Sequence, residues 1–285
     1  MATGEFGAIE RLLKKGERTV RVSKVWRRIH EETGAGIITR GQLQFTPSDL
    51  KRLREYGKYV SRGLDPRYDS LSGNRMEMAK KTQNEKFSSD SVFGDLLVLA
   101  TAGETEVVIN GQPVKTPQGS VLSIHPGTLD REALKQSRVV IIENGSLMPY
   151  WQDIRLPPEW QDGVLLYRGH RENMQLVRAI IEDQPAENLA LYYDFDPEGL
   201  EMALGIGKGT VLIPTDWERL IEDEGLRKEI SQRDAYRRQS RAMTRLKRLA
   251  KGTDWESVVV AMGEVELAVM QEHLTVRGWM LAGSC

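Results

Sequence analysis

Two aspartates, Asp194 and Asp196, stand one residue apart just after an apolar run at residues 189–193. Alternate residues of a β-strand point to the same side of a sheet, so both carboxylates are expected to project together from the end of this strand. Carboxylates that lie this close repel one another strongly unless a cation neutralises them. Carboxylate oxygens are ligands that suit Mg²⁺ or Mn²⁺. The pair therefore predicts a divalent metal site.

A third carboxylate, Glu143, follows another short apolar stretch. Residues 139–142 are four consecutive β-branched side chains, a pattern typical of a strand that is covered on both faces in a parallel sheet. Ligands of open parallel sheets bind beyond the carboxyl ends of the strands. Because Glu143 and the aspartate pair both follow such strands, we expect folding to bring the three carboxylates together.

The elements expected around these acids alternate in the manner of an α/β protein. Alternating strands and helices favour a mostly parallel sheet with helices packed on it. The predicted strands lie near residues 138–142, 163–170, 189–193 and 211–214, and the predicted helices lie at about 172–182 and after Pro197.

The aspartate pair also has a purely structural interpretation. Asp196 precedes Pro197, and a helix often begins with an aspartate as N-cap and a proline in its first turn. One carboxylate oxygen can cap a helix while the other binds a metal ion. Both interpretations therefore stay open from the sequence.

The composition indicates a globular chain with two domains, or one domain with an extension. It has 285 residues, 40% of them hydrophobic, and no apolar stretch reaches the roughly 18 residues that a membrane-spanning helix requires. The first residues are polar and lack the apolar segment of a secretory signal. The single cysteine, Cys285, excludes an internal disulfide and a thiolate zinc cluster. We therefore expect a cytoplasmic protein without a membrane partner.

The net charge of −1 hides a strong segregation of charge. Residues 1–86 contain 19 Lys or Arg against 11 Asp or Glu, and residues 227–251 contain 10 against 2. Basic segments that flank an acidic, metal-suited domain fit a protein that grips a phosphate backbone. Solvated helix faces or a subunit contact are the alternatives. The candidate DNA-binding arginines are Arg27, Arg28, Arg237, Arg238, Arg241 and Arg245.

Three regions are expected along the chain. Residues 1–90 predict short basic helices followed by a linker, as in a helical or winged-helix DNA-binding module. Residues 91–135 predict a β-hairpin or wing element, because Asn110-Gly111 between apolar runs is a strong hairpin signal. Residues 136–285 predict the α/β domain, including one basic amphipathic helix at 227–251.

The Glu-Asn-Gly stretch at residues 143–145 and the Asp-Phe-Asp-Pro-Glu-Gly stretch at residues 194–199 resemble the Toprim domain. The Asp-x-Asp-Pro-x-Gly form is similar to the A subunit of topoisomerase VI. The Glu-Asn start and the size are more similar to the JetD/MksG family of SMC-associated nucleases that restrict plasmids. The Gln-Glu pair at residues 271–272 is weakly similar to an element late in that family.

This resemblance implies a Toprim-like parallel-sheet fold and a Mg²⁺-dependent DNA endonuclease. It further implies a homodimer that cleaves double-stranded DNA as part of an SMC-like complex against plasmid or other foreign DNA. In the family the glutamate and the aspartate pair hold Mg²⁺ or Mn²⁺, and this role carries over to Glu143, Asp194 and Asp196. Arg168, His170 and Lys208 are candidate contacts to phosphate. Glu272 is a candidate additional acid.

Two other functions remain open. A topoisomerase VI A-like transesterase would attack DNA with a tyrosine, and the nearest candidates are Tyr56, Tyr59 and Tyr68. Tyr56 and Tyr59 fall on an apolar helical stripe and are expected in a core. Without a convincing tyrosine motif, hydrolysis is favoured over transesterification. A non-catalytic DNA-binding or assembly subunit would use the acids for structure alone.

Overall fold

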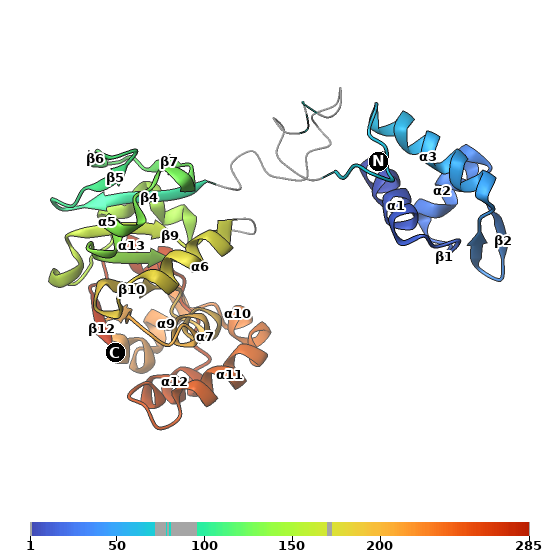
Figure 1. Ribbon diagram of the computed structural model, residues 1–285. Helices are drawn as coiled ribbons and strands as arrows, with labels where there is room; N and C mark the ends of the chain where they lie inside the picture. Colours follow the sequence, from blue (N-terminus) through green and yellow to red (C-terminus); the bar gives the residue numbers. More distant parts are fainter. Residues whose placement is uncertain (1, 72–77, 79, 81–95, 170–172, 285) are drawn as a thin grey trace. The chain divides into compact units, whose positions relative to one another are not determined.

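The computed structural model forms two compact units, Met1–Gly94 and Asp95–Cys285, and each unit is described by itself (Figure 1). Most of the linker expected before residue 90 lies outside the described residues. None of the described helices is long and apolar enough to cross a membrane. The residues that the structure describes are 2–71, 78, 80, 96–169 and 173–284.

Residues 2–71 of the first unit form three helices and a small antiparallel sheet with the strand order β1–β3–β2. Apolar side chains from the helices and the sheet meet in one core, which includes Ile9, Ile29, Leu43 and Leu53. The helical N-terminal region expected from the sequence is therefore present. Its elements in chain order are α1 (Ala2–Lys15), β1 (Thr19–Arg21), α2 (Lys24–Thr33), β2 (Ile37–Thr39), β3 (Gln42–Gln44) and α3 (Pro47–Ser61).

Local signals determine where α2 and α3 begin and end. The Ser23 hydroxyl accepts a hydrogen bond from the Trp26 backbone N–H and caps α2. The helix ends at Gly34, whose φ of 63° is in the left-handed region that favours glycine. Thr46 and Asp49 form a reciprocal capping box at the start of α3.

The sequence pattern does not predict the hairpin of β2 and β3. Its turn residues, Arg40 and Gly41, have φ values of 49° and 78°, as a two-residue type I′ turn requires. Strands of three residues are too short to display a clear alternation of apolar and polar side chains. The hairpin therefore becomes visible only in the folded unit.

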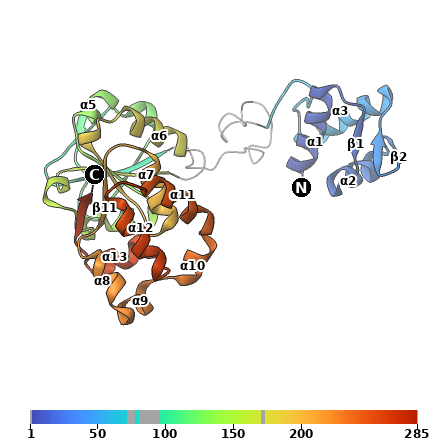
Figure 2. The same cartoon turned by 90° about the horizontal axis from the view of Figure 1, so that it is seen from below.

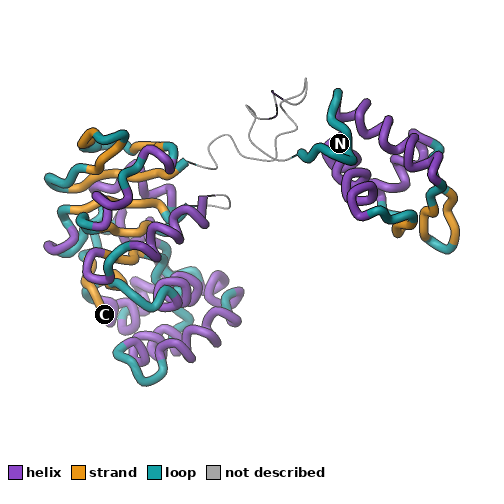
Figure 3. Tube along the Cα trace, in the orientation of Figure 1, coloured by secondary structure: helices purple, strands orange, loops and turns teal. Residues whose placement is uncertain are grey.

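The second unit contains a seven-stranded sheet with the order β12–β11–β10–β8–β9–β4–β7, and helices pack around it (Figures 2 and 3). The central strands β11, β10, β8 and β9 run parallel, and the outer strands are antiparallel to their neighbours. The strands are β4 (Leu97–Ala102), β7 (Leu122–Ile124), β8 (Val139–Ile142), β9 (Gly163–Tyr167), β10 (Leu189–Tyr192), β11 (Thr210–Pro214) and β12 (Leu281–Ser284).

The buried central strands confirm the α/β class. All four residues of β8 are 0% exposed, which agrees with a strand that is covered on both faces. The apolar runs predicted to form strands at residues 138–142, 163–170, 189–193 and 211–214 correspond to β8, β9, β10 and β11.

The sequence pattern predicted that residues 91–135 form a separate β-hairpin or wing element, but two of their strands, β4 and β7, belong to the main sheet. β4 pairs with β9 and β7 pairs with β4, so both strands extend the main sheet. This pairing joins segments far apart in the chain, which local patterns cannot reveal. The predicted hairpin is present nearby as β5 (Val107–Ile109) and β6 (Gln112–Val114), with Asn110 and Gly111 at its turn.

The helices of the second unit are mostly short. The α-helices are α5 (Arg131–Lys135), α6 (Met174–Asp183), α7 (Pro197–Gly205), α8 (Trp217–Glu222), α9 (Glu224–Ile230), α10 (Arg233–Arg238), α11 (Ser240–Ala250), α12 (Trp255–Glu264) and α13 (Gln271–Val276). The 3-10 helices are η2 (Pro126–Thr128), η3 (Gly145–Asp153), η4 (Pro158–Trp160) and η6 (Ala186–Asn188).

The prediction of one basic helix at residues 227–251 is wrong, because α9, α10 and α11 occupy this segment. The chain leaves helical geometry at Ser231 and Gln232. The Gln232 backbone N–H donates to the Ala268 carbonyl at 2.8 Å, and the Ala268 N–H donates to Ser231 Oγ at 3.1 Å. These tertiary hydrogen bonds replace the bonds that a continuous helix would make.

The first turn of α7 leaves no room for a side chain at Gly199. A Cβ atom there would lie 2.2 Å from the carbonyl oxygen of Asp194 and 2.9 Å from its backbone nitrogen. We expect Gly199→Ala to lower the free energy of unfolding by about 3 kcal/mol, because backbone atoms must move to relieve the overlap. Urea unfolding followed by tryptophan fluorescence measures this, since five of the six tryptophans lie in the second unit.

Gly205→Ala, at the other end of the same helix, is the matched control. No atom lies within 4 Å of a Cβ at Gly205, and alanine favours the helix over glycine. This variant should gain roughly 0.5–1 kcal/mol of stability. Equal effects of the two substitutions would contradict the tight approach at Gly199.

Candidate metal and nucleic-acid site

Glu143 and Asp194 meet where the strand order of the sheet reverses. The chain runs from β8 to β9 on one side of β8 and then crosses to β10 on the other side. Open α/β sheets bind ligands at such a switch point, beyond the carboxyl ends of the strands. Glu143 follows β8, Asp194 follows β10, and the Asp194 backbone N–H donates to Glu143 Oε2 at 2.9 Å.

Both carboxyl groups lie where their charged form is disfavoured. Burial raises the pKa of Glu143, and the Arg168 guanidinium, 3.3 Å from Glu143 Oε1, opposes this effect. Burial and then the nearby charge of Glu143 raise the pKa of Asp194 to about 7. The Gln271 backbone N–H, which donates to Asp194 Oδ1 at 2.7 Å, partly offsets the burial. A carboxyl group with this pKa is poised to bind a proton or a cation at neutral pH.

Asp196 contributes directly to the fold. It is the N-cap of α7, where its Oδ1 accepts a hydrogen bond from the Gly199 N–H at 2.8 Å and Pro197 occupies the first turn. Its Oδ2 accepts from Gln239 Nε2 at 2.7 Å, and the residue is 2% exposed. The helix-capping interpretation of the sequence is therefore correct. Because each carboxylate oxygen has two lone pairs, capping still leaves acceptor positions for a cation.

Glu272 belongs to the same acidic cluster. Its Oε1 accepts hydrogen bonds from the Asn144 side-chain amide and, at 2.7 Å, from Ser146 Oγ. Its Oε2 is buried and has no hydrogen-bond partner within the described part of the chain. The charge of Glu272 also contributes to the raised pKa of Asp194. The unpaired oxygen is available to a cation or to a hydrogen-bond donor.

Amide side chains to which the sequence assigned no role position these acids. Gln271 is 0% exposed, donates through Nε2 to the Tyr192 carbonyl at 2.7 Å and accepts at Oε1 from the Asn144 N–H at 2.9 Å. Gln271 therefore ties the end of β8 to the end of β10. Gln239 and the Asn144 side chain hold the acids described above. The weak resemblance at residues 271–272 was the sequence feature that indicated this network. No feature of the sequence indicated Gln239.

The donor set suits a hard divalent cation. The Glu143 carboxylate contacts the Asp194 backbone N–H, and the charges of Glu143, Asp196 and Glu272 all help to raise the pKa of Asp194. In the part of the chain that the structure describes, no three His, Cys, Asp or Glu side chains form a ready-made metal-binding group. Mg²⁺ usually keeps several waters and takes only one or two carboxylates from a protein. Glu143 and Asp194 are therefore the residues that would hold such an ion.

The other residues predicted to contact phosphate differ in their surroundings. Arg168 lies beside the acids, and its Nε is buried without a partner among the described residues. Lys208 donates to the carbonyl oxygens of Glu182 and Gln184 at 2.8 and 2.7 Å, so its charge supports the C-terminus of α6. His170 lies outside the described residues.

The second basic segment contains both paired and unpaired arginines. Arg245 makes a two-pronged ion pair with Glu201 at 2.7 and 2.8 Å, and Arg237 pairs with Glu266 at 3.0 Å. These two arginines support the packing of their helices. The arginines of this segment that are exposed and have no ion pair within the described ranges are Arg238, Arg241 and Arg248.

In the first unit, Glu5 engages two of the candidate residues. Arg28 forms an ion pair with this buried carboxylate at 3.0 Å, and the Tyr56 phenol donates to it at 3.2 Å. Burial and then the charge of Glu5 raise the pKa of Tyr56 to about 12. Arg27, on the same helix as Arg28, is exposed and makes no ion pair with any described residue.

The expectation that Tyr59 lies in the core is wrong, because this residue is 79% exposed. An α-helix turns by about 100° per residue, so the step from Leu50 to Tyr59 carries the side chain to the opposite face. Tyr68 is 70% exposed, and the guanidinium carbons of Arg54 and Arg67 lie 5.3 and 5.9 Å from its ring centroid. Tyr68 therefore stands at the surface beside two positive charges.

The fold and the site define an α/β protein with an acidic cluster at the switch point of a mostly parallel sheet. Residues 94–282, more than half of the chain, match the family described as "Domain of unknown function (DUF7281)". The chain belongs to this family. No curated protein matches the sequence.

The raised pKa of Asp194 makes the stability of the fold depend on pH. Its pKa rises from an ordinary value of 3.8 to about 7, so its contribution is fully present below about pH 4 and is lost as the pH rises through 7. In the presence of EDTA, Asp194→Asn should therefore be more stable than the wild type at pH 8 by a few kcal/mol, and this advantage should shrink toward pH 4. Urea unfolding at several pH values measures the difference.

Glu104→Gln is the matched control for this experiment. The Glu104 side chain is 95% exposed in the same unit and pairs with Lys115 at the surface. The free energy of unfolding of Glu104→Gln should depend on pH in the same way as that of the wild type. If the free energies of unfolding of Asp194→Asn and the wild type differ by the same amount at every pH, the pKa of Asp194 is not raised.

Proposed function

We propose that the protein is a Mg²⁺-dependent DNA endonuclease of the Toprim type. The observation that carries the proposal is the contact between Glu143 and Asp194 at the switch point, where burial and the charge of Glu143 disfavour the charged form of Asp194. Such a pair destabilises a core that has no cation to accompany it. A divalent cation removes the repulsion and suits the carboxylate oxygens.

Each side chain of the site then has a role in cleavage. A bound Mg²⁺ would stabilise negative charge on the phosphodiester and on its leaving oxygen. Glu143 and Asp194 hold the ion, and Asp196 fixes the start of α7 beside them. Arg168 binds a phosphate oxygen through the exposed part of its guanidinium. Glu272 accepts a hydrogen bond from water at its unpaired Oε2.

Exposed basic residues supply contacts to the DNA backbone. The helix α11 begins next to the acids, because Gln239 at its N-cap donates to Asp196. In the first unit, the helix α2, which carries Arg27, and the β2–β3 hairpin resemble the helix and wing of a DNA-binding module. The basic residues on or next to α11 that are exposed and have no ion pair within the described ranges are Arg238, Arg241, Lys247, Arg248 and Lys251.

The resemblance to the JetD/MksG family supports a finer proposal. The acids follow β8 and β10, the strands on either side of the switch point, as the Toprim interpretation requires. We extend the proposal to a cytoplasmic homodimer that cleaves double-stranded DNA as a subunit of an SMC-like complex against plasmid or other foreign DNA.

A non-catalytic DNA-binding or assembly role is the second candidate. It is favoured by Asp196, because both of its oxygens accept hydrogen bonds within the protein. It is also favoured by the lack of a ready-made metal-binding group among the described residues. A tyrosine transesterase is a third candidate and would depend on Tyr59 or Tyr68, because Tyr56 is bonded to Glu5.

Incubation of the full-length protein with supercoiled plasmid and Mg²⁺ or Mn²⁺ tests the proposal. We expect the wild type to nick or linearise the plasmid and to leave ends that carry no protein. Asp194→Asn and Glu143→Gln should each slow cleavage at least about 100-fold, because each removes a charged ligand of the ion. Glu104→Gln, the exposed control, should cleave at the wild-type rate.

The same samples distinguish the other candidates. Cleavage that survives unchanged in Asp194→Asn would exclude the acidic cluster as the active site. Protein-linked DNA ends that disappear in Tyr68→Phe would establish the transesterase instead. Calorimetric titration that detects no Mg²⁺ binding to the wild type would favour a structural role for the acids.

A further inference from the structure

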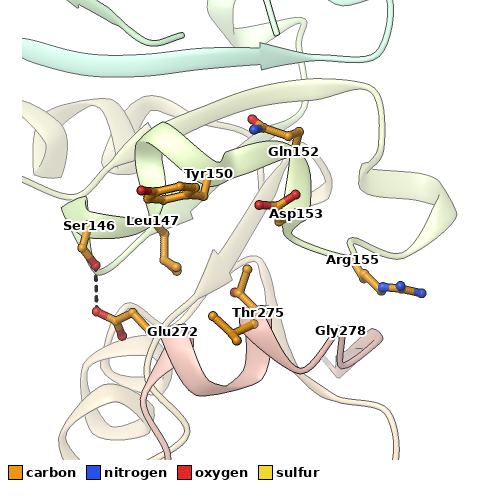
Figure 4. A pocket seen from close by; sticks show the side chains of 10 residues that line it. Ser146, Leu147, Tyr150, Gln152, Asp153, Arg155, Glu272, Thr275 and Gly278 are labelled. Atoms are coloured by element: carbon orange, nitrogen blue, oxygen red, sulfur yellow. Dashed lines mark hydrogen bonds between the residues drawn. The ribbon is translucent and has the colours of Figure 1, made fainter. Parts of the chain in front are cut away.

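A pocket of about 750 Å³ adjoins the acidic cluster, between η3 and α13 (Figure 4). Glu272 lines this pocket, and its carboxylate accepts the hydrogen bond from Ser146 Oγ that Figure 4 shows. The preceding residue, Gln271, donates to the Asp194 carboxylate. The pocket therefore begins next to the proposed metal ligands. Its volume falls in the range of small-molecule binding sites.

Tyr150 forms one wall of the pocket, and neighbouring residues of its segment are anchored in the fold. The residue is 60% exposed, whereas the nearby Met148 is buried and Trp151 Nε1 donates to the Ser120 carbonyl at 2.9 Å. The backbone of Tyr150 leaves helical geometry directly after Pro149. An aromatic side chain on such an anchored segment loses little entropy when it binds a planar ligand.

The remaining lining is apolar in its middle and polar at its ends. Leu147 supplies apolar surface under the Tyr150 ring, and Gln152 and Asp153 supply hydrogen-bond donors and acceptors. Figure 4 shows Glu272 at one end of the pocket and Arg155 at the other. The Arg155 side chain is exposed and makes no ion pair with any described residue.

We propose that this pocket binds one unpaired nucleotide of the DNA substrate, with its base stacked on Tyr150 and an adjoining phosphate on Arg155. The proposal rests on the nuclease function proposed above and specifies its substrate class. A base within a duplex is covered by its neighbours and must leave the stack before it can enter a pocket. The geometry thus favours DNA that has a single-stranded nucleotide next to the cleaved phosphate, as at an overhang, a gap or a melted site.

The chemistry of the lining fits a nucleotide better than other small ligands. A free anion would be repelled by Glu272 and Asp153 at the polar positions. A purely apolar ligand would leave these same groups without hydrogen bonds. A nucleotide satisfies both regions, because its base offers a flat face and polar edges. Stacking also tolerates any base, since every base has a π face.

Binding measured in EDTA tests this proposal separately from cleavage. Fluorescence anisotropy of the full-length protein would compare a blunt duplex with the same duplex that carries a short single-stranded tail. We expect the wild type to bind the tailed duplex more tightly. Tyr150→Ala should weaken this binding about tenfold and leave the blunt duplex unaffected, because stacking of one base is lost. Tyr150→Phe keeps the ring and should bind as the wild type does.

Tyr59→Ala is the matched control, because Tyr59 is also an exposed tyrosine but belongs to the first unit. Tyr59→Ala should change the affinities for the blunt and the tailed duplex by the same factor. Equal wild-type affinity for the two duplexes, or an equal loss on both with Tyr150→Ala, would overturn the pocket proposal. Tail binding that depends on Tyr150 without any cleavage would uphold the pocket and reject the nuclease. Cleavage by a wild type that shows no preference for the tailed duplex would reject the pocket and uphold the nuclease.

Discussion

The burial of two carboxyl groups, Glu143 and Asp194, at the ends of neighbouring parallel strands is the constraint on which the rest of the site depends. Charge is unfavourable in this position, and backbone N–H groups of Asp194 and Gln271 replace part of the lost hydration. Arg168 adds a positive charge from beyond β9. Each of these groups comes from a different element, so the site exists only when β8, β9, β10 and α13 are assembled.

Packing around the acids connects them to the basic part of the same unit. Asp196 caps α7 and accepts a hydrogen bond from Gln239, which precedes α11. Gly199 allows α7 to approach the backbone of Asp194 closely, and α7 in turn packs on α11. A basic helix is therefore held beside the acidic strand ends. The segregation of charge along this unit thus places a basic helix next to acidic groups in space.

Elements with strong local signals agree well with the sequence predictions. The buried run at residues 139–142 forms β8, and Asn110-Gly111 forms the turn of a hairpin. Predictions that depended on distant partners were less accurate. Two strands, β4 and β7, joined the main sheet, and residues 227–251 split into three helices, because strand pairing and hydrogen bonds to remote residues decided both outcomes.

By itself, the sequence determined that Glu143 and Asp194 follow buried strands of an α/β fold. Strand periodicity, helix caps and turn residues are local properties, and each can be recognised within a few residues. Only the tertiary structure decided how closely these acids approach, that the pKa of Asp194 rises to about 7, and that Gln271 and Gln239 hold the cluster together. Burial and hydrogen bonds between residues far apart in the chain set these properties, and no local pattern records them.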